Sequence, residues 1–342
     1  MLSLAAVGGM LPEELGPRLD SAGRPERPTL TIDADIPATG AERQRGLDAV
    51  RAAGAITVAV ATSTAISAEL AAAVDLPIGA RGHPHAPSTL VVDDPGAAAA
   101  VAVERAAEHP VAALSLAWLL RGSAGLPVPE ALAAESAVYS ALLAGADFGQ
   151  WLERRGPARP PDGDGRLDVS RRDDVLSIVL NRVPRRNAVD ARMRDALRAA
   201  LEVAELDPSL TVELSAAGPS FSAGGDLDEF GTARDPARAH VIRVTAAPGA
   251  VVHRLRERVT VRLHGACVGA GIEIPAFAGR VIAAPGTFFL LPELAMGLVP
   301  GAGGTVSITR RVGRGRMLWM ALTGERVDVA TALEWGLIDA AE

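Results

Sequence analysis

The chain has 342 residues, of which 49% are hydrophobic, so two domains with substantial cores are expected. Aromatic residues make up only 3% and the formal net charge is −7, which argues against nucleic-acid binding through stacked bases or a basic surface. The single cysteine, Cys267, excludes an intramolecular disulfide and a cysteine-based metal cluster. The sequence shows no targeting segment and no apolar run long enough to span a membrane, so we expect a cytoplasmic protein.

The first part of the chain predicts a mixed α/β domain over residues 28–153, after an irregular segment over residues 1–27 that is rich in Pro, Gly and charge. Apolar patterning and capping residues predict strands at residues 29–33, 55–62 and 88–94, and helices at residues 42–53, 95–108 and 110–120. Residues 127–155 carry apolar side chains at helical spacing and predict a long helix.

Three residues of this first domain are candidates for a functional role. His83 and His85 lie two residues apart in a loop, but no carboxylate or cysteine stands at ligand spacing, so we expect no metal there. Tyr139 lies on the apolar face of the predicted long helix, and we expect it in the core. We therefore expect no functional site in the first domain.

Residues 154–166 combine Pro, Gly and charge without apolar periodicity, and they predict a linker. Beyond the linker, strands, helices and glycine turns alternate through residues 167–342, which is typical of an α/β fold with crossover helices. The expected elements are a hairpin within residues 167–182, strands at 211–217, 259–265, 280–284 and 287–291, and helices at 187–203 and from about 272.

Two carboxylates and a glycine-dense turn lie within residues 263–305. The turn over residues 265–271 has few bulky side chains, so its backbone N–H groups can approach a ligand closely. The strand path that follows can return Glu293 to the neighbourhood of Glu273. Two carboxylates at one site can divide acid and base roles, because burial and mutual repulsion separate their pKa values. Either glutamate alone is equally typical of an ordinary first helical turn.

A second glycine turn, Gly224-Gly225, lies between a predicted strand and a helix, and it lets the N–H of Gly225 face a ligand. One N–H group from each of two glycine turns is what an oxyanion hole for a thioester enolate needs. Cys267 lies inside the first turn, but no base is placed in sequence to activate it, so we expect only a packing role.

Four segments follow one another in this order: LNRVPRRNAV, FSAGGDLDEF, HGACVGAGIE and LPELAMGLVPGAGGT. Together they resemble the enoyl-CoA hydratase/isomerase (crotonase) family over residues 167–342. The resemblance implies an α/β fold, with a crotonase-like ββα spiral core after an amino-terminal mixed α/β and helical domain. It also implies which residues bind the thioester and its CoA moiety. The oxygen would be held by the N–H groups of Gly225 and Ala270, and the two hydratase glutamates would be Glu273 and Glu293. The implied CoA contacts are Arg182, Arg185, Arg186, Ala188, Ala223, Asp226, Leu227 and Gly269.

The sequence also departs from the pattern of the family. Family members usually continue past the segment that resembles ALEWGLIDA with a helical module, whereas this sequence ends at Glu342. Residues 95–155 are similar in cadence to that module, so we expect it at the amino terminus, as in a circular permutation. The resemblance further implies a homotrimer or a homohexamer.

The leading function implied by the resemblance is hydration or dehydration of a 2-enoyl-CoA, with no cofactor beyond the coenzyme A moiety of the substrate and no metal. Three alternatives stay open. They are an enoyl-CoA isomerase or thioester hydrolase, a cofactor-independent dioxygenase of an aryl-acetyl-CoA, and a non-catalytic acyl-CoA-binding scaffold. We expect an acyl-CoA as the partner, and neither nucleic acid nor a membrane.

Overall fold

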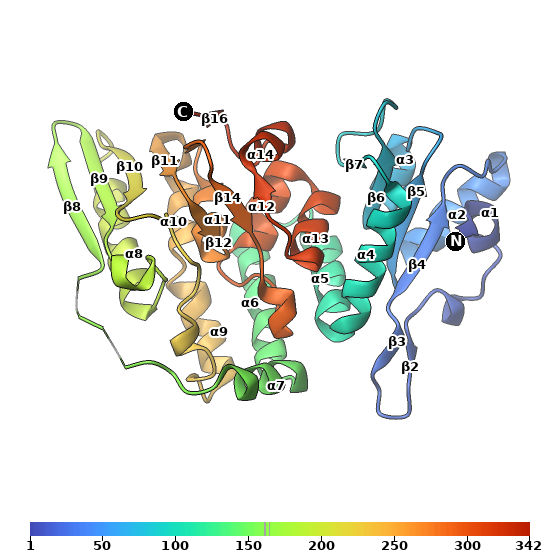
Figure 1. Cartoon of the computed structure of the whole chain (residues 1–342), viewed down its shortest axis with the longest axis horizontal. Coiled ribbons are helices and arrows are strands. Elements are labelled where there is room, and N and C mark those ends of the chain that lie inside the picture. Colours follow the sequence, from blue (N-terminus) through green and yellow to red (C-terminus); the bar gives the residue numbers. More distant parts are fainter. Residues whose placement is uncertain (161, 164) are drawn as a thin grey trace. The chain divides into compact units, whose positions relative to one another are not determined.

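The computed structural model describes residues 1–160, 162–163 and 165–342, and it divides into two compact units (Figure 1). The first unit comprises residues 1–122 and 313–323, and the second comprises residues 123–312 and 324–342. The division thus lies after Gly122 rather than near residue 165. The reason is that helices within residues 128–155 pack against helices of the second unit.

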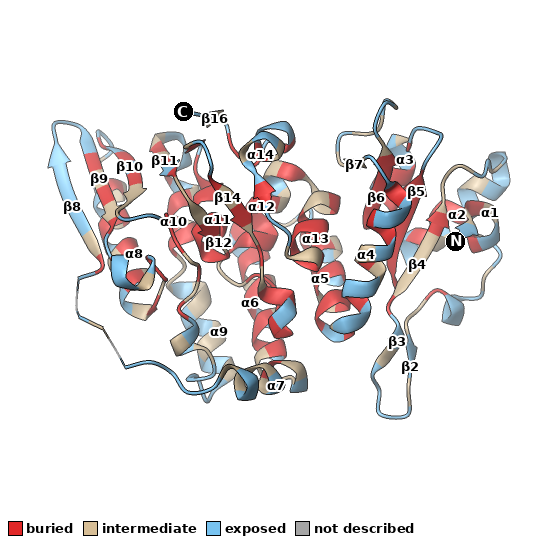
Figure 2. Ribbon diagram, viewed as in Figure 1, coloured by how far each residue is buried: buried red, intermediate tan, exposed pale blue. Residues whose placement is uncertain are grey.

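The first unit is built on a sheet of parallel strands in the order β1-β4-β5-β6-β7. Its strands are β1 (Leu2–Ser3), β4 (Thr29–Asp33), β5 (Ile56–Ala61), β6 (Leu76–Ala80) and β7 (Leu90–Val92). All of β5 is buried, as expected for a central parallel strand that is covered on both faces (Figure 2). The three predicted strands are confirmed, whereas β6 was not predicted, because its sequence contains Pro77 and Gly79, which weaken a strand signal.

The first unit contains the three helices predicted from the sequence and three others. They are α1 (Leu4–Val7), α2 (Gly40–Ala52), α3 (Ala68–Ala73), α4 (Pro95–Glu108), α5 (Pro110–Ser123, ending just past the division) and α13 (Arg314–Thr323). The predicted helices are α2, α4 and α5. Asp94 caps α4 as predicted, because its carboxylate accepts from the N–H of Ala97 at 2.9 Å. Helix α13 packs against α4 and β6.

The prediction that residues 1–27 are irregular is wrong in part. Besides β1 and α1, this segment forms an antiparallel pair of β2 (Arg18–Leu19) and β3 (Pro25–Arg27). The physical reason is that Leu4 and Val7 are buried in the core of the first unit, so the start of the chain is ordered by hydrophobic packing.

His85 is held by the backbone of the first unit. Its Nδ1 accepts from the N–H of Ile66 at 3.1 Å, and its Nε2 lies 2.7 Å from the carbonyl oxygen of Ala80. Both ring nitrogens are therefore used in fixing the loop. Within the described ranges, no group of three or more His, Cys, Asp or Glu residues is arranged to hold a metal ion.

The second unit has a main sheet in the order β16-β13-β11-β10-β9-β8, in which β8 and β9 form the predicted antiparallel hairpin and the other pairs are parallel. Its strands are β8 (Leu167–Arg172), β9 (Val175–Leu180), β10 (Thr211–Ala216), β11 (Val259–Leu263), β13 (Arg280–Ala283) and β16 (Ala340–Ala341). A small sheet joins β12 (Ala266–Val268), β14 (Phe288–Leu290) and β15 (Val327–Asp328). Edge strand β8 is mostly exposed, and it is pale blue in Figure 2.

Helices surround these sheets in the second unit. They are α6 (Val128–Leu143), α7 (Ala146–Arg155), α8 (Ala191–Leu206), α9 (Pro236–Thr245), α10 (Pro248–Arg254), α11 (Ala270–Glu273), α12 (Gly304–Val312) and α14 (Val329–Trp335). The long helix predicted over residues 127–155 is two helices, because Ala144 and Gly145 interrupt it. Helix α6 packs against α9, α10 and α12.

The segment predicted as a linker, residues 154–166, is tied to the second unit where it is described; Pro161 and Asp164 lie outside the described residues. Arg166 is buried and binds the carboxylate of Asp190 with its Nε and Nη2 atoms. Asp162 pairs with Arg182 at 2.6 Å. These ion pairs correct the expectation of a free linker. No helix in the described part of the chain is long and apolar enough to cross a membrane.

Candidate active site

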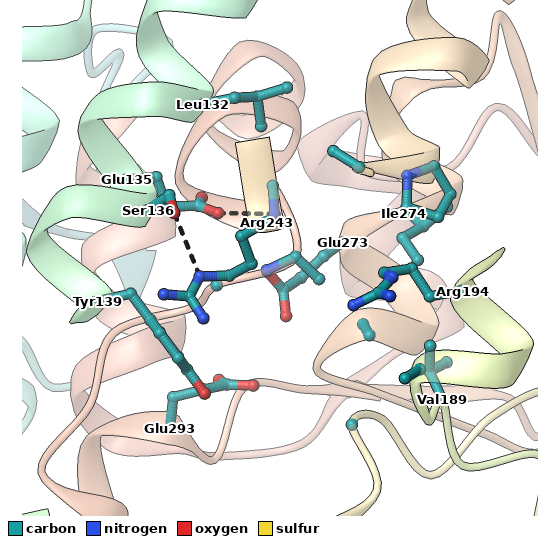
Figure 3. Close-up of a pocket in the computed structure, with 18 of the residues that line it drawn as sticks. Leu132, Glu135, Ser136, Tyr139, Val189, Arg194, Arg243, Glu273, Ile274 and Glu293 are labelled. Atoms are coloured by element: carbon teal, nitrogen blue, oxygen red, sulfur yellow. Dashed lines mark hydrogen bonds between the residues drawn. The ribbon is translucent and has the colours of Figure 1, made fainter. Parts of the chain in front are cut away.

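A cavity of about 230 Å³ lies in the second unit (Figure 3). Helix α6 lines one side of it, and residues of α8, α9, α10 and α11 line other parts. The turn that contains Gly225, the turn before α12 and Glu293 also contribute to the lining. The two glutamates and the two N–H donors predicted from the sequence all line this one cavity: Glu273, Glu293, Gly225 and Ala270. The structure therefore brings together residues that come from separate turns of the chain.

Glu273 and Glu293 face one backbone position. A Cβ atom built on Gly269 would lie 2.6 Å from Oε1 of Glu293 and 3.6 Å from Oε1 of Glu273. Gly269 also has a φ of +48°, a conformation that glycine adopts without strain. The absent side chain at this turn leaves room for both carboxylates.

Glu273 is 2% exposed, and Oε2 of its carboxylate accepts from the N–H of Ala302 at 2.8 Å and of Gly304 at 2.9 Å. Burial raises the pKa of Glu273 to about 7, although the two N–H donors favour its charged form. A carboxyl group with this pKa can exchange a proton near neutral pH, which is what general acid or base catalysis needs.

Glu293 is 8% exposed, and its Oε2 is buried without a hydrogen-bond partner among the described residues. Burial raises the pKa of Glu293 well above its usual range, and the charge of Glu273 raises it further. The two glutamates thus have different surroundings, since one carboxylate is held by backbone donors and the other is not. This difference favours a neutral Glu293 beside an ionised Glu273.

The N–H groups of Gly225 and Ala270 have no hydrogen-bond partner within the part of the chain that the structure describes. The two turns that carry them touch, because a Cβ atom at Gly224 would lie 2.8 Å from the carbonyl oxygen of Val268. Gly224 has a φ of +90°, so both the conformation and the space require glycine. Two free donors in one cavity can bind a developing oxyanion.

Glu135 is a third buried carboxylate of the cavity, and the sequence analysis did not identify it. It is 2% exposed and accepts from the N–H of Gly303 at 2.7 Å, the N–H of Thr305 at 2.9 Å and the hydroxyl of Thr305 at 2.6 Å. Burial raises the pKa of Glu135 to about 8, and the charge of Glu273 adds to the shift. The sequence signal that could have identified Glu135 is its helical spacing from Leu132 and Tyr139, which places all three on the buried face of α6.

Tyr139 was predicted to lie in the core, and the structure shows that it is buried and also lines the cavity. Its ring fills the space beside Gly301, where an added Cβ atom would lie 2.5 Å from the ring. Burial raises the pKa of the Tyr139 hydroxyl, so the phenol is neutral.

The residues predicted to contact CoA lie outside the cavity lining. Arg182 is buried and pairs with Asp226 at 2.7 Å, and Arg185 pairs with Asp228 at 3.1 Å. These two guanidinium groups are thus already bound to carboxylates of the chain. Arg186 and Leu227 are exposed, Ala188 and Gly269 are buried, and Ala223 is half-buried. Their CoA contacts stay predictions.

Cys267 is fully buried in β12 and does not line the cavity. Burial raises the pKa of its thiol, which disfavours the thiolate that a nucleophile would need.

The second unit therefore combines an α/β core with two glycine turns that present free N–H groups beside buried carboxylates, an arrangement suited to thioester chemistry. Residues 170–342, half of the chain, match the family model of enoyl-CoA hydratase/isomerase. The chain belongs to the enoyl-CoA hydratase/isomerase family, and the predicted α/β fold class with a crotonase-like core is confirmed.

Solved structures of similar proteins match about half of the chain. An enoyl-CoA hydratase from Thermoplasma volcanium is 29% identical, with 52% of this chain and 71% of that chain covered and a TM-score of 0.48. DspI from Pseudomonas aeruginosa is 31% identical, with 53% and 70% covered and a TM-score of 0.48. An enoyl-CoA hydratase from Shewanella pealeana is 25% identical, with 52% and 69% covered and a TM-score of 0.49.

Proposed function

We propose that this protein adds water to a 2-enoyl-CoA, or removes water in the reverse direction. The observation that carries the proposal is the placement of Glu273 and Glu293 around Gly269, with the free N–H groups of Gly225 and Ala270 in the same cavity. The thioester oxygen accepts from both N–H groups, which stabilise the negative charge that develops as an enolate forms.

The surroundings of the two glutamates support distinct roles. Ionised Glu273, held by two backbone N–H groups, takes a proton from the water that attacks the β-carbon. Neutral Glu293 delivers a proton to the α-carbon, a role for which burial favours its protonated form. Two carboxyl groups with different proton affinities suit hydration, which uses both, better than a reaction that uses only one carboxyl group.

The proposal extends to the rest of the ligand and to assembly. The CoA moiety lies against the residues that the family resemblance implies, among which Arg186 and Leu227 are exposed and free to meet it. The protein assembles as a homotrimer or homohexamer, and sedimentation of the full chain tests this directly.

The direct test is hydration of crotonyl-CoA, measured as the loss of absorbance of its conjugated thioester. Turnover that falls in both Glu273→Gln and Glu293→Gln supports the proposal. Near-normal turnover by either variant contradicts the mechanism with two glutamates. Oxygen uptake with an aryl-acetyl-CoA would instead identify a dioxygenase. Double-bond migration without addition of water would identify an isomerase, and release of CoA would identify a thioester hydrolase. Binding of acyl-CoA without any turnover would identify a scaffold.

A further inference from the structure

We propose that Arg243 binds a carboxylate at the end of the acyl chain, so that the substrate is the CoA monothioester of an unsaturated dicarboxylic acid. This inference rests on the proposed function, because it names the substrate class of the same cavity. It comes from one side chain on α9 that no predicted role accounts for.

Arg243 lines the cavity, and neutral groups of α6 hold it there. Its Nε donates to the Ser136 hydroxyl at 3.2 Å, and its Nη2 donates to the Ser140 hydroxyl. Its Cζ atom lies 4.6 Å from the centre of the Tyr139 ring, within the range of a cation–π contact. Figure 3 shows the guanidinium group between α6 and the two glutamates. The side chain is thus oriented before any ligand binds.

The guanidinium group keeps donors for a ligand. Its Nη1 has no hydrogen-bond partner in the described residues, and no carboxylate among them lies within ion-pair distance of Arg243. Arg243 is half-buried, and because burial takes its charge partly out of water, the pKa of its guanidinium group is lowered. A planar guanidinium with free N–H groups is the side chain best suited to bind a carboxylate in a bidentate way.

The other arginine of the cavity differs in this respect. Arg194 pairs with the neighbouring Asp195 at 2.7 Å, and in Figure 3 it lies on the other side of the view from Arg243. Outside the cavity, Arg182 and Arg185 each pair with an aspartate. Arg243 is therefore a cation in the cavity whose countercharge a ligand can supply.

The three buried glutamates of the cavity do not form an ion pair with Arg243 in place of a ligand. Both oxygens of Glu135 accept from residues 303 and 305, and Oε2 of Glu273 accepts from residues 302 and 304. Burial raises the pKa of Glu293 well above its usual range, which favours its uncharged form. Glu135 attracts Arg243 through space without touching it. The competing explanation is that Arg243 only balances these buried charges, in which case it would not discriminate between acyl groups.

A matched pair of substrates separates these explanations. Crotonyl-CoA and glutaconyl-CoA differ by one terminal carboxylate, and the wild type should prefer glutaconyl-CoA in kcat/KM. Arg243→Gln should lower that preference by about 10- to 100-fold, which is the range for losing a charge-assisted hydrogen bond. Arg243→Lys should keep part of the preference because it keeps the charge. Equal losses for both substrates would show that Arg243 only balances charge, and would overturn the inference.

Binding tests the inference independently of turnover. Glutaryl-CoA and butyryl-CoA are saturated analogues that again differ by one terminal carboxylate, and their Kd values can be measured by calorimetry. Tighter binding of glutaryl-CoA by the wild type supports the inference even if crotonyl-CoA and glutaconyl-CoA are not hydrated, a result that would refute only the proposed reaction. Hydration of crotonyl-CoA with no preference for either dicarboxylic thioester would leave the proposed function standing and overturn the role of Arg243. The wild-type comparison decides this even if Arg243→Gln fails to fold.

Discussion

Glu135 and Glu273 bind alternate backbone N–H groups of one turn. Glu273 accepts from residues 302 and 304, and Glu135 accepts from residues 303 and 305. This turn leads into α12, where the backbone N–H groups at the start of the helix favour negative charge. Glu135 comes from α6, outside the segment that matches the family model. A carboxylate from that helix therefore fixes the turn that also holds the glutamate proposed as the base.

Replacement of Glu135 by Gln should leave the proton affinity of Glu273 nearly unchanged. The pKa of Glu135, about 8, lies above that of Glu273, about 7, so Glu135 is still protonated while Glu273 loses its proton, and Gln replaces one neutral group by another. The acid limb of the pH profile of kcat/KM for crotonyl-CoA should therefore stay within about half a unit of the wild-type position. A shift to lower pH by about one unit or more in a folded variant would show that Glu135 is ionised beside Glu273.

Stability should also depend on these carboxyl groups. The pKa values of Glu135 and Glu273 are raised from 4.5 to about 8 and about 7, so the folded protein holds protons that the unfolded chain has lost. The free energy of unfolding should therefore fall as the pH rises from about 5 to about 8. Denaturant unfolding across this range measures the slope, which should be smaller in Glu135→Gln. A wild-type slope of the opposite sign would contradict the raised pKa values.

Both proposed proton-transfer residues should be essential for hydration. Glu273→Gln and Glu293→Gln keep the shape of the side chains and should each lower kcat by on the order of 10²–10⁴-fold. Cys267→Ala serves as a control, because this thiol is buried in β12 and does not line the cavity. It should keep its activity within about threefold, whereas abolished activity in a folded Cys267→Ala protein would revive covalent catalysis.

Gly269→Ala tests the geometry between the two glutamates. The added methyl group would meet Oε1 of Glu293 at 2.6 Å, so we expect a loss of hydration of at least about 100-fold. Gly286→Ala is the matched control, because Gly286 has a φ of +80° but open space around its Cβ position. Both variants should lose about 1–2 kcal/mol of stability through backbone strain, and only Gly269→Ala should lose its activity. Equal activities would show that the site tolerates a displaced Glu293.

The sequence predicted those parts of the site that local patterns encode. The glycine turns and the return of Glu293 toward Glu273 follow from turn residues and strand lengths within a short stretch of chain. Glu135 could not be predicted in this way, because its partner Gly303 lies 168 residues away in sequence. Only the packing of α6 against α12 brings them together. For the same reason the sequence did not predict that Arg182, named as a CoA contact by the family resemblance, pairs with Asp226.

Helices α6 and α7 should be necessary for the family segment to fold. They bury Tyr139, Leu142 and Phe148, and Phe148 stacks on Trp151 and lies near Phe230 of the cavity lining. A fragment of residues 166–342 lacks this covering and should be poorly soluble, because an apolar face of this size is unfavourable in water.

A fragment of residues 123–342 is the matched control, because it differs from the shorter one only by α6, α7 and the segment up to residue 165. It keeps Glu135 and the complete cavity lining, so it should be the more soluble of the two and should keep some hydration activity. Sedimentation and crotonyl-CoA turnover of both fragments measure the difference. A soluble, oligomeric and active 166–342 fragment would show that α6 is an appendage, and the idea that amino-terminal helices replace the usual helical module would have to be abandoned.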